Sequence, residues 1–168
     1  MSLLRIDFSA LEQLIKDVDL KLYQLPRAVQ VKMIKVASDY VLKEIKKNAR
    51  TMTHGQYALP ESDTKTIANS AFVDEKHMGD YIPYAEINFK GTVSKYWEPR
   101  IKNPKVMRNG KRRIAEVAFL NEYGVPKNKN QGARGYLIKS MNEGMAKAID
   151  PLLDILENYI ADSLTKIV

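Results

Sequence analysis

The sequence predicts an α+β fold, in which amphipathic helices pack on a small, mainly antiparallel sheet. Segments of helical periodicity stand at both ends of the chain, and short segments rich in β-branched and aromatic residues lie between them. The alternation of strand and helix that builds parallel sheets is missing. A chain of 168 residues with 45% hydrophobic content is long enough for one core, so we expect a single domain over residues 1–168.

Two amphipathic helices are expected first. In the earlier one, over about residues 9–24, Ser9 suits the N-cap, Glu12 follows three residues later, and leucines recur at helical spacing. In the next one, Pro26 suits a first helical turn. Lysines occupy one side of this second helix, and apolar residues occupy the other side: Val29, Met33, Val36, Ala37, Tyr40, Val41 and Ile45.

The middle of the chain is expected to form strands. After a long loop near residues 50–63, the segments "TKTIANSAFV" (64–73) and "DYIPYAEINFKG" (80–91) have strand composition. Asn109 and Gly110 lie between two segments that we expect to be extended, in the stretch "VMRNGKRRIAEVAF" (106–119). Both central residues of a type I′ turn need positive φ, so Asn-Gly indicates a hairpin. The region of residues 91–113 is therefore expected to protrude as a hairpin.

The end of the chain is expected to be a long helix. Apolar residues are in helical register from Gly135 until Asp150 and Pro151 interrupt the pattern. Asp150 can cap a helix and Pro151 can occupy a first turn. The last segment is thus either a new helix or the far side of a kink, so we expect a kinked or broken helix.

The net charge of +7 is located in one segment of the chain. Residues 100–113, "RIKNPKVMRNGKRR", contain seven basic residues and no acidic one: Arg100, Lys102, Lys105, Arg108, Lys111, Arg112 and Arg113. Subtracting these seven from the 27 basic residues leaves 20, equal to the 20 acidic residues. Such a cluster can meet phosphate, an acidic protein surface or only water.

Catalytic interpretations find little support in the sequence. His54 and His77 are far apart, no serine stands in a Gly-x-Ser-x-Gly turn, and residues 132–135 do not match a phosphate-binding loop. The stretch "DEKHMGD" offers Asp74, Glu75, His77 and Asp80 as metal ligands, but such residues are common in polar turns. We therefore expect no enzymatic activity, no metal and no cofactor.

Membrane insertion is not expected either. The chain has no run of about eighteen apolar residues, and its first residues, "MSLLRIDFSALEQL", include acids among the leucines. The absence of cysteine excludes disulfides and fits assembly in a reducing cytoplasm.

The stretch "AFLNEYGVPKNKNQGARGYLIKS" (118–140) has the composition of a corner. Gly124 can adopt positive φ and end the preceding segment. Glu122 can pair with Arg134 across the loop and so fix where the last helix begins. The alternative is two solvated side chains, since an exposed pair contributes only about 0–1 kcal/mol. We interpret the stretch as a strand-to-helix corner.

The same stretch resembles the tail-completion family of tailed phages, named after the tenth gene product of a lambda-like phage. That family has an alanine, a glutamate four residues later, an aromatic and a glycine at a corner, followed by an Ala-Arg segment that leads into a C-terminal helix. Gly135 stands here where the family usually has proline, and Ile67 with Ser70 loosely echoes an earlier segment. The matching residues are Ala118, Glu122, Tyr123, Gly124, Ala133, Arg134, Tyr136 and Leu137.

The resemblance implies a structural virion protein that joins head and tail. Its subunits would form a ring that caps the tail tube, docks to the head-connector proteins and surrounds the DNA channel. The implied location is the tail or head-tail interface of the virion, after assembly in the bacterial cytoplasm. A closed ring needs two complementary faces on each subunit. The basic cluster is then expected to face DNA or an acidic partner ring, and the following residues to form the corner and a subunit contact: Glu122, Tyr123, Gly124, Arg134 and Tyr136.

Two other classes stay open. A sequence-nonspecific nucleic-acid-binding module would use the same basic hairpin and bind phosphate in a salt-dependent manner. A metal-dependent nuclease would use the carboxylates of "DEKHMGD", and it rests on that group alone.

Overall fold

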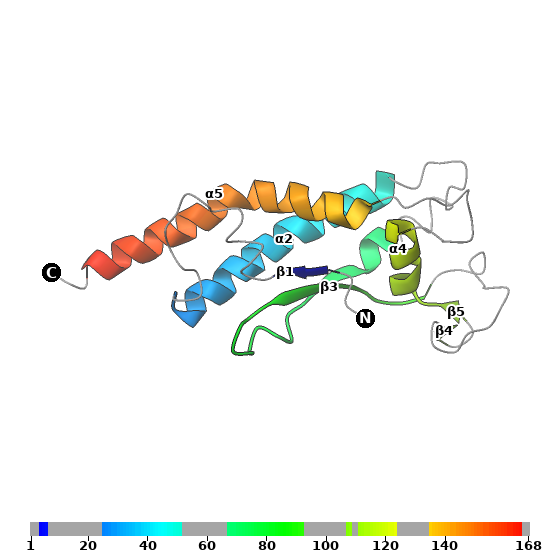
Figure 1. Ribbon diagram of the computed structural model, residues 1–168, viewed down its shortest axis with the longest axis horizontal. Helices are drawn as coiled ribbons and strands as arrows, with labels where there is room; N and C mark the ends of the chain where they lie inside the picture. Colours follow the sequence, from blue (N-terminus) through cyan, green and yellow to red (C-terminus); the bar gives the residue numbers. More distant parts are fainter. Residues whose placement is uncertain are drawn as a thin grey trace.

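The computed structural model describes residues 4–6, 25–51, 67–92, 107–108, 111–123 and 135–165. The α+β class is confirmed, with α2 lying between α5 and a small sheet (Figure 1). The helix expected over residues 9–24 lies outside the described residues, as does most of the loop near residues 50–63. The order of elements is β1 (Leu4–Ile6), α2 (Arg27–Thr51), β2 (Ala71–Asp74), β3 (Ala85–Phe89), β4 (Met107–Arg108), β5 (Lys111–Arg112), α4 (Ile114–Tyr123) and α5 (Tyr136–Thr165).

Helix α2 is amphipathic as predicted. The Pro26 carbonyl accepts hydrogen bonds from the amides of Val29 (2.9 Å) and Gln30 (3.1 Å), so Pro26 caps the helix from the position just before its first residue. Each fully buried aliphatic side chain contributes about 1.5–3 kcal/mol relative to its exposed state. Helix α2 therefore contributes a large part of the hydrophobic core. The buried apolar residues on its inner side include Met33, Ile34, Ala37, Val41 and Ile45.

The sheet has the order β1-β3-β2, and both pairs of strands are antiparallel. Along β3, Ala85, Ile87 and Phe89 are buried and the residues between them are half-buried, which is the alternation of a sheet with one covered face. The covered face lies against α2. The sequence predicted β2 and β3 as strands, but β1 was not predicted.

The strand boundaries correct two expectations. The strand expected over residues 64–73 is wrong at residues 67–70, which form a helical turn in which Ser70 Oγ donates to the Ile67 carbonyl at 2.7 Å. The strand expected over residues 80–91 is confirmed only for Ala85–Phe89, since the residues just before it form a turn.

The hairpin predicted at Asn109 and Gly110 is confirmed by the pairing of β4 with β5, in the register Met107↔Arg112 and Arg108↔Lys111. The extended segment expected after it is wrong. Helix α4 begins at Ile114, whose amide donates to the Gly91 carbonyl at 3.2 Å. Its buried residues Ile114, Val117 and Ala118 have the i, i+3, i+4 spacing of one helix face.

Helix α5 is continuous through Pro151 and is bent (Figure 1), so of the two expected forms the kinked helix is confirmed and the broken helix is not. Proline has no amide to donate to the carbonyl four residues earlier, and such positions bend helices. The helix packs along α2 at Gly144, which is buried. A Cβ at Gly144 would lie 2.5 Å from Val41 Cα, so only glycine permits this approach of the two backbones.

Candidate assembly site: the α4–α5 junction and the basic hairpin

Glu122, in the last turn of α4, binds the N-terminus of α5. Its Oε2 accepts a hydrogen bond from the Leu137 amide at 2.6 Å, and its Oε1 accepts one from the Ile138 amide at 3.2 Å. Amides in a first helical turn have no partner within their own helix, and a carboxylate there also meets the positive end of the helix dipole. The Glu122 side chain is fully buried. Glu122 therefore holds the start of α5 through backbone amides.

Gly135 completes the junction. Its amide donates to the Glu122 carbonyl at 3.1 Å, and its carbonyl accepts from the Lys139 amide at 3.0 Å. Its φ of 58° lies in the left-handed region, which costs most other residues roughly 1–2 kcal/mol. Proline, the usual residue of the resembled family at this position, cannot adopt that φ. The chain thus enters α5 by a geometry that requires the departure from the family pattern.

Tyr136 lies inside the core of the chain, with 2% of its surface exposed. Among the described residues, no hydrogen-bond partner meets its hydroxyl group. Burial, and secondarily the charge of Glu122, raise the pKa of the Tyr136 hydroxyl. Tyr136 is therefore a neutral packing residue, and the surface of the junction is formed by other side chains.

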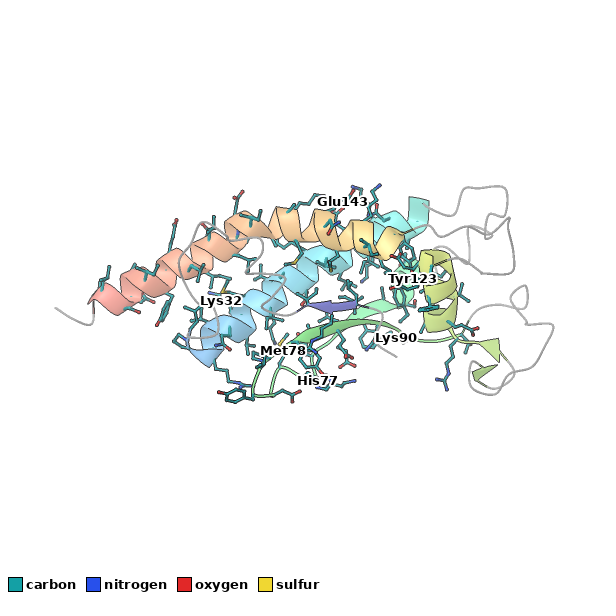
Figure 2. All side chains as sticks on the ribbon, viewed as in Figure 1. Lys32, His77, Met78, Lys90, Tyr123 and Glu143 are labelled. Carbon is teal, nitrogen blue, oxygen red and sulfur yellow. The ribbon has the colours of Figure 1, made fainter. Side chains whose placement is uncertain are left out.

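Two large apolar side chains are exposed at the junction. Tyr123 is 53% exposed and Ile138 is 51% exposed. The Phe119 ring lies 4.7 Å from the Tyr123 ring at a tilt of 47°, so the Tyr123 ring has a fixed support on α4. Figure 2 shows Tyr123 beside α4, near the beginning of α5. We call Phe119, Tyr123 and Ile138 the junction surface.

The corner predicted for residues 118–140 is a corner between two helices, so the strand-to-helix interpretation is wrong. The four-residue spacing of Ala118 and Glu122, which both lie in α4, is a helical signal. Gly124 and Arg134 lie outside the described residues. The pair of Glu122 with Arg134 stays a prediction.

The basic cluster is described in part. Arg108 lies in β4, and Lys111 and Arg112 lie in β5. Arg113 is exposed, and its backbone forms an isolated antiparallel β-bridge with Thr92. The hairpin lies beside α4 at one end of the molecule (Figure 1). The backbone thus brings four of the seven basic residues together at the start of α4, whereas the junction lies at its end. The other three, Arg100, Lys102 and Lys105, lie outside the described residues.

Polar contacts between α2 and α5, which the sequence did not predict, orient the junction further. Asn48 Nδ2 donates to Ser140 Oγ at 2.9 Å and to Glu143 Oε2 at 3.0 Å. Lys147 Nζ donates to Glu44 Oε1 at 2.6 Å, and the Glu44 side chain is 4% exposed. This hydrogen bond is the main reason why the pKa of Glu44 lies below its ordinary value. The partners in these hydrogen bonds are 92 to 103 residues apart along the chain, so no local sequence pattern predicted the contacts.

The residues of "DEKHMGD" build the turn before β3. Asp74 accepts from Asn88 Nδ2 at 3.2 Å, Glu75 pairs with Lys35 at 2.7 Å, and His77 Nδ1 lies 2.7 Å from Asp80 Oδ2. In the part of the chain that the structure describes, no group of three or more His, Cys, Asp and Glu side chains is arranged to hold a metal ion. These side chains therefore have partners within the turn, on α2 and on β3.

Comparison of the chain with protein-family models, with curated proteins and with solved structures found no match. Within the described ranges, none of the helices combines the length and apolar character needed to cross a membrane. The fold and the site define a small α+β protein in which a basic hairpin precedes α4 and an apolar junction surface follows at the end of α4.

Proposed function

We propose that the chain is a structural subunit of a phage or prophage virion that acts in tail completion or head-tail joining. The observation that carries the proposal is the α4–α5 junction. The residues of the resemblance that can be located there act as one unit, because Glu122 binds the start of α5 while Ala118, Tyr136 and Leu137 are buried around it. Tyr123, at the same place, is left exposed for a neighbour.

The surface chemistry supports assembly. The basic hairpin lies at the start of α4 and the apolar junction surface lies at the end of α4 (Figure 1). A subunit of a closed ring needs two different, complementary faces. In the proposed setting the ring surrounds the DNA channel and contacts tail-tube and head-connector proteins. The positive hairpin then meets DNA phosphate or an acidic neighbour.

The test is genetic and microscopic. Inactivation of the gene in the phage or prophage that encodes the chain should leave DNA-filled heads and finished tails separate under negative-stain microscopy. A plasmid copy of the unaltered gene should restore joined particles. A plasmid copy that carries the control substitution Tyr81→Ala should restore them too, because Tyr81 is exposed far from the junction on the turn before β3. Tyr123→Ala should reduce joining. Normal virions without the gene would refute the proposal.

A second candidate function, sequence-nonspecific nucleic-acid binding, is favoured by the four basic residues of the hairpin region, Arg108, Lys111, Arg112 and Arg113. Each phosphate neutralised adds about −0.9 to the slope of log affinity against log salt, so four contacts would give roughly −3.6. Filter binding to duplex DNA over a salt series measures this slope. A monomer that binds with micromolar affinity would favour this function over a ring component. Cleavage of the duplex with magnesium or manganese would instead favour a nuclease.

A further inference from the structure

The two long helices carry exposed cations close to the line along which they pack together. On α2, the exposed residues Lys43, Lys47 and Arg50 are spaced by four and three residues, so they share one face of the helix. On α5, Lys139 and Lys147 are exposed and lie about two helical turns apart. We call these five residues the basic seam.

A buried carboxylate brings two cations of the basic seam together across the helices. Glu44 Oε1 accepts a hydrogen bond from Lys147 Nζ at 2.6 Å, and Glu44 Oε2 accepts one from Lys47 Nζ at 3.4 Å. The Glu44 side chain is 4% exposed, whereas the side chains of Lys47 and Lys147 are 63% and 51% exposed. The negative charge therefore lies beneath the surface and the two ammonium groups lie at it. Their positions are set before a ligand arrives, which lowers the entropic cost of binding an anion.

A second carboxylate has the same arrangement one turn earlier in α5. Glu143 Oε2 accepts from Asn48 Nδ2 of α2 at 3.0 Å, and Glu143 Oε1 lies 3.8 Å from Lys139 Nζ. Figure 2 shows Glu143 on the side of α5 that is turned away from the sheet. The basic seam thus presents five exposed cations above one buried and one half-buried carboxylate.

The positive charge is confined to these turns of the two helices. Asp39 precedes Lys43 by one turn of α2, and Asp150 follows Lys147 by about one turn of α5, so acidic residues border the seam on that side. Lys46, which is half-buried, adds a further positive charge in the same turns of α2. The basic seam is therefore a bounded patch and not a feature of the whole helix pair.

The dimensions of the patch suit a phosphate backbone. At 1.5 Å per residue, the cations span about 11 Å along α2 and about 12 Å along α5. One strand of a nucleic-acid duplex carries a phosphate about every 3.4 Å along the duplex axis. Each row of the basic seam therefore matches the length of about three phosphates.

We propose that the basic seam binds the phosphate backbone of duplex nucleic acid. None of the large apolar side chains that are exposed in the described ranges lies on α2 or between residues 139 and 147 of α5, and the seam itself has no aromatic residue. A protein partner would require buried apolar or aromatic anchors, and a single strand would require aromatic side chains on which its bases stack. Phosphate contacts require only spaced cations.

The site goes beyond the proposed function, because it shares no residue with the basic hairpin or with the junction surface. A duplex can bind the basic seam whether or not the hairpin contacts DNA. The binding is independent of base sequence, since no side chain of the seam is placed to read base edges when its cations contact the backbone.

The test is the affinity of the full chain for a short fluorescent duplex, measured by anisotropy between about 50 and 200 mM salt. The seam variant is Lys43→Gln with Lys139→Gln, which removes two exposed cations and leaves Glu44 with both of its lysines. Each lost phosphate contact should make the slope of log affinity against log salt less steep by about 0.9, so the variant should differ by about 1.8. The loss should be equal for duplexes of different sequence.

The matched control is Lys32→Gln with Lys90→Gln, which removes the same charge at exposed positions outside the basic seam and should keep the slope of the unaltered chain. Lys43→Arg with Lys139→Arg keeps the charge and should retain binding. The loss should persist in a chain that also carries Lys111→Gln, because the hairpin is a separate site. Far-UV circular dichroism checks that every variant is folded.

Lysine acetylation followed by mass spectrometry gives a local measurement on the unaltered chain. Bound duplex should protect Lys43, Lys47 and Lys139 from the reagent, and it should leave Lys32 and Lys90 as reactive as in the free chain. Equal reactivity of both groups of lysines would contradict binding at the seam.

Equal slopes for the seam variant and the control would overturn the inference. So would a chain that binds no duplex at about 0.1 mM in 50 mM salt, which is the weak limit of non-specific binding, and an acidic protein would then be the better ligand. The genetic test is independent of these results. Separate heads and tails without duplex binding would refute only the seam, and seam binding with normal virions in the absence of the gene would refute only the virion function.

Discussion

Replacement of Glu122 by glutamine tests the contact that positions α5. The carboxylate accepts two hydrogen bonds from amides of α5, and the side chain is fully buried. A hydrogen bond to a charged group contributes about 1.5–3 kcal/mol. Glutamine keeps one acceptor oxygen and presents an NH₂ group to the other amide, so Glu122→Gln should lower the free energy of unfolding by about 2–3 kcal/mol. Glu122→Ala, which removes both acceptors and leaves a cavity, should cost about 3–5 kcal/mol.

The assay is equilibrium unfolding in urea at neutral pH, followed by far-UV circular dichroism. Glu157→Gln is the matched control, because Glu157 is an exposed residue of α5, and such substitutions change stability by less than about 0.5 kcal/mol. Amide hydrogen exchange gives a local measurement. The amides of Leu137 and Ile138 should exchange faster in Glu122→Gln, while the amide of Met145 in the middle of α5 should follow only the global stability.

A Glu122→Gln variant as stable as the control, with unchanged exchange at Leu137 and Ile138, would refute the reasoning. It would mean that the start of α5 is held by packing around Tyr136 and Leu137 alone.

Three further predictions concern the helices and the junction. Gly144→Ala should destabilise the chain by about 1–3 kcal/mol or more in urea unfolding, because its Cβ would meet the Val41 backbone, whereas Gly79→Ala, with nothing within 4 Å, should be nearly neutral. Because the pKa of Glu44 is lowered mainly by Lys147, the stabilisation from this carboxylate is complete above its ordinary pKa of 4.5 and is lost as the pH falls through the lowered value. The stability gap between the unaltered chain and Glu44→Gln should therefore narrow in acid, and a constant gap from pH 7 to pH 3 would contradict this. A double-mutant cycle of Glu122 and Arg134 should give a coupling energy of at least about 0.5 kcal/mol if the two side chains pair, and additive effects would remove that pair.

The elements that the sequence predicted are those with a regular local pattern. Helix α2 follows from its repeated apolar side, β3 from its alternation, and the β4–β5 hairpin from Asn109 and Gly110. Strand β1 has only Leu4–Ile6, which is too short for alternation to appear, and it forms by pairing with β3 some eighty residues later. Helix α4 was missed because its β-branched Ile114 and Val117 follow a hairpin and favour an extended reading. Burial against the rest of the core overrides that preference.

The sequence predicted several residues of the candidate site, but it did not predict the contacts that these residues make. Glu122 was expected to act through Arg134, which lies outside the described residues; its observed partners are amides fifteen and sixteen residues away, which no side-chain pattern indicates. The positive φ of Gly135 and the buried position of Tyr136 likewise depend on how α4 meets α5. The contacts of Asn48 and Glu44 with α5 arise only when the two long helices pack together.

The hydrogen bond from the Gly135 amide to the Glu122 carbonyl also has a practical use in labelling. It joins Glu122 to Gly135, and residues 124–134, eleven residues in length, lie between these two in the sequence. The entropy of closing a loop grows slowly, by about 0.6 kcal/mol for each doubling of its length. A peptide epitope of similar length inserted in this segment should therefore leave α4 and α5 in place. An antibody against that epitope would then locate the subunit directly in electron micrographs of assembled particles.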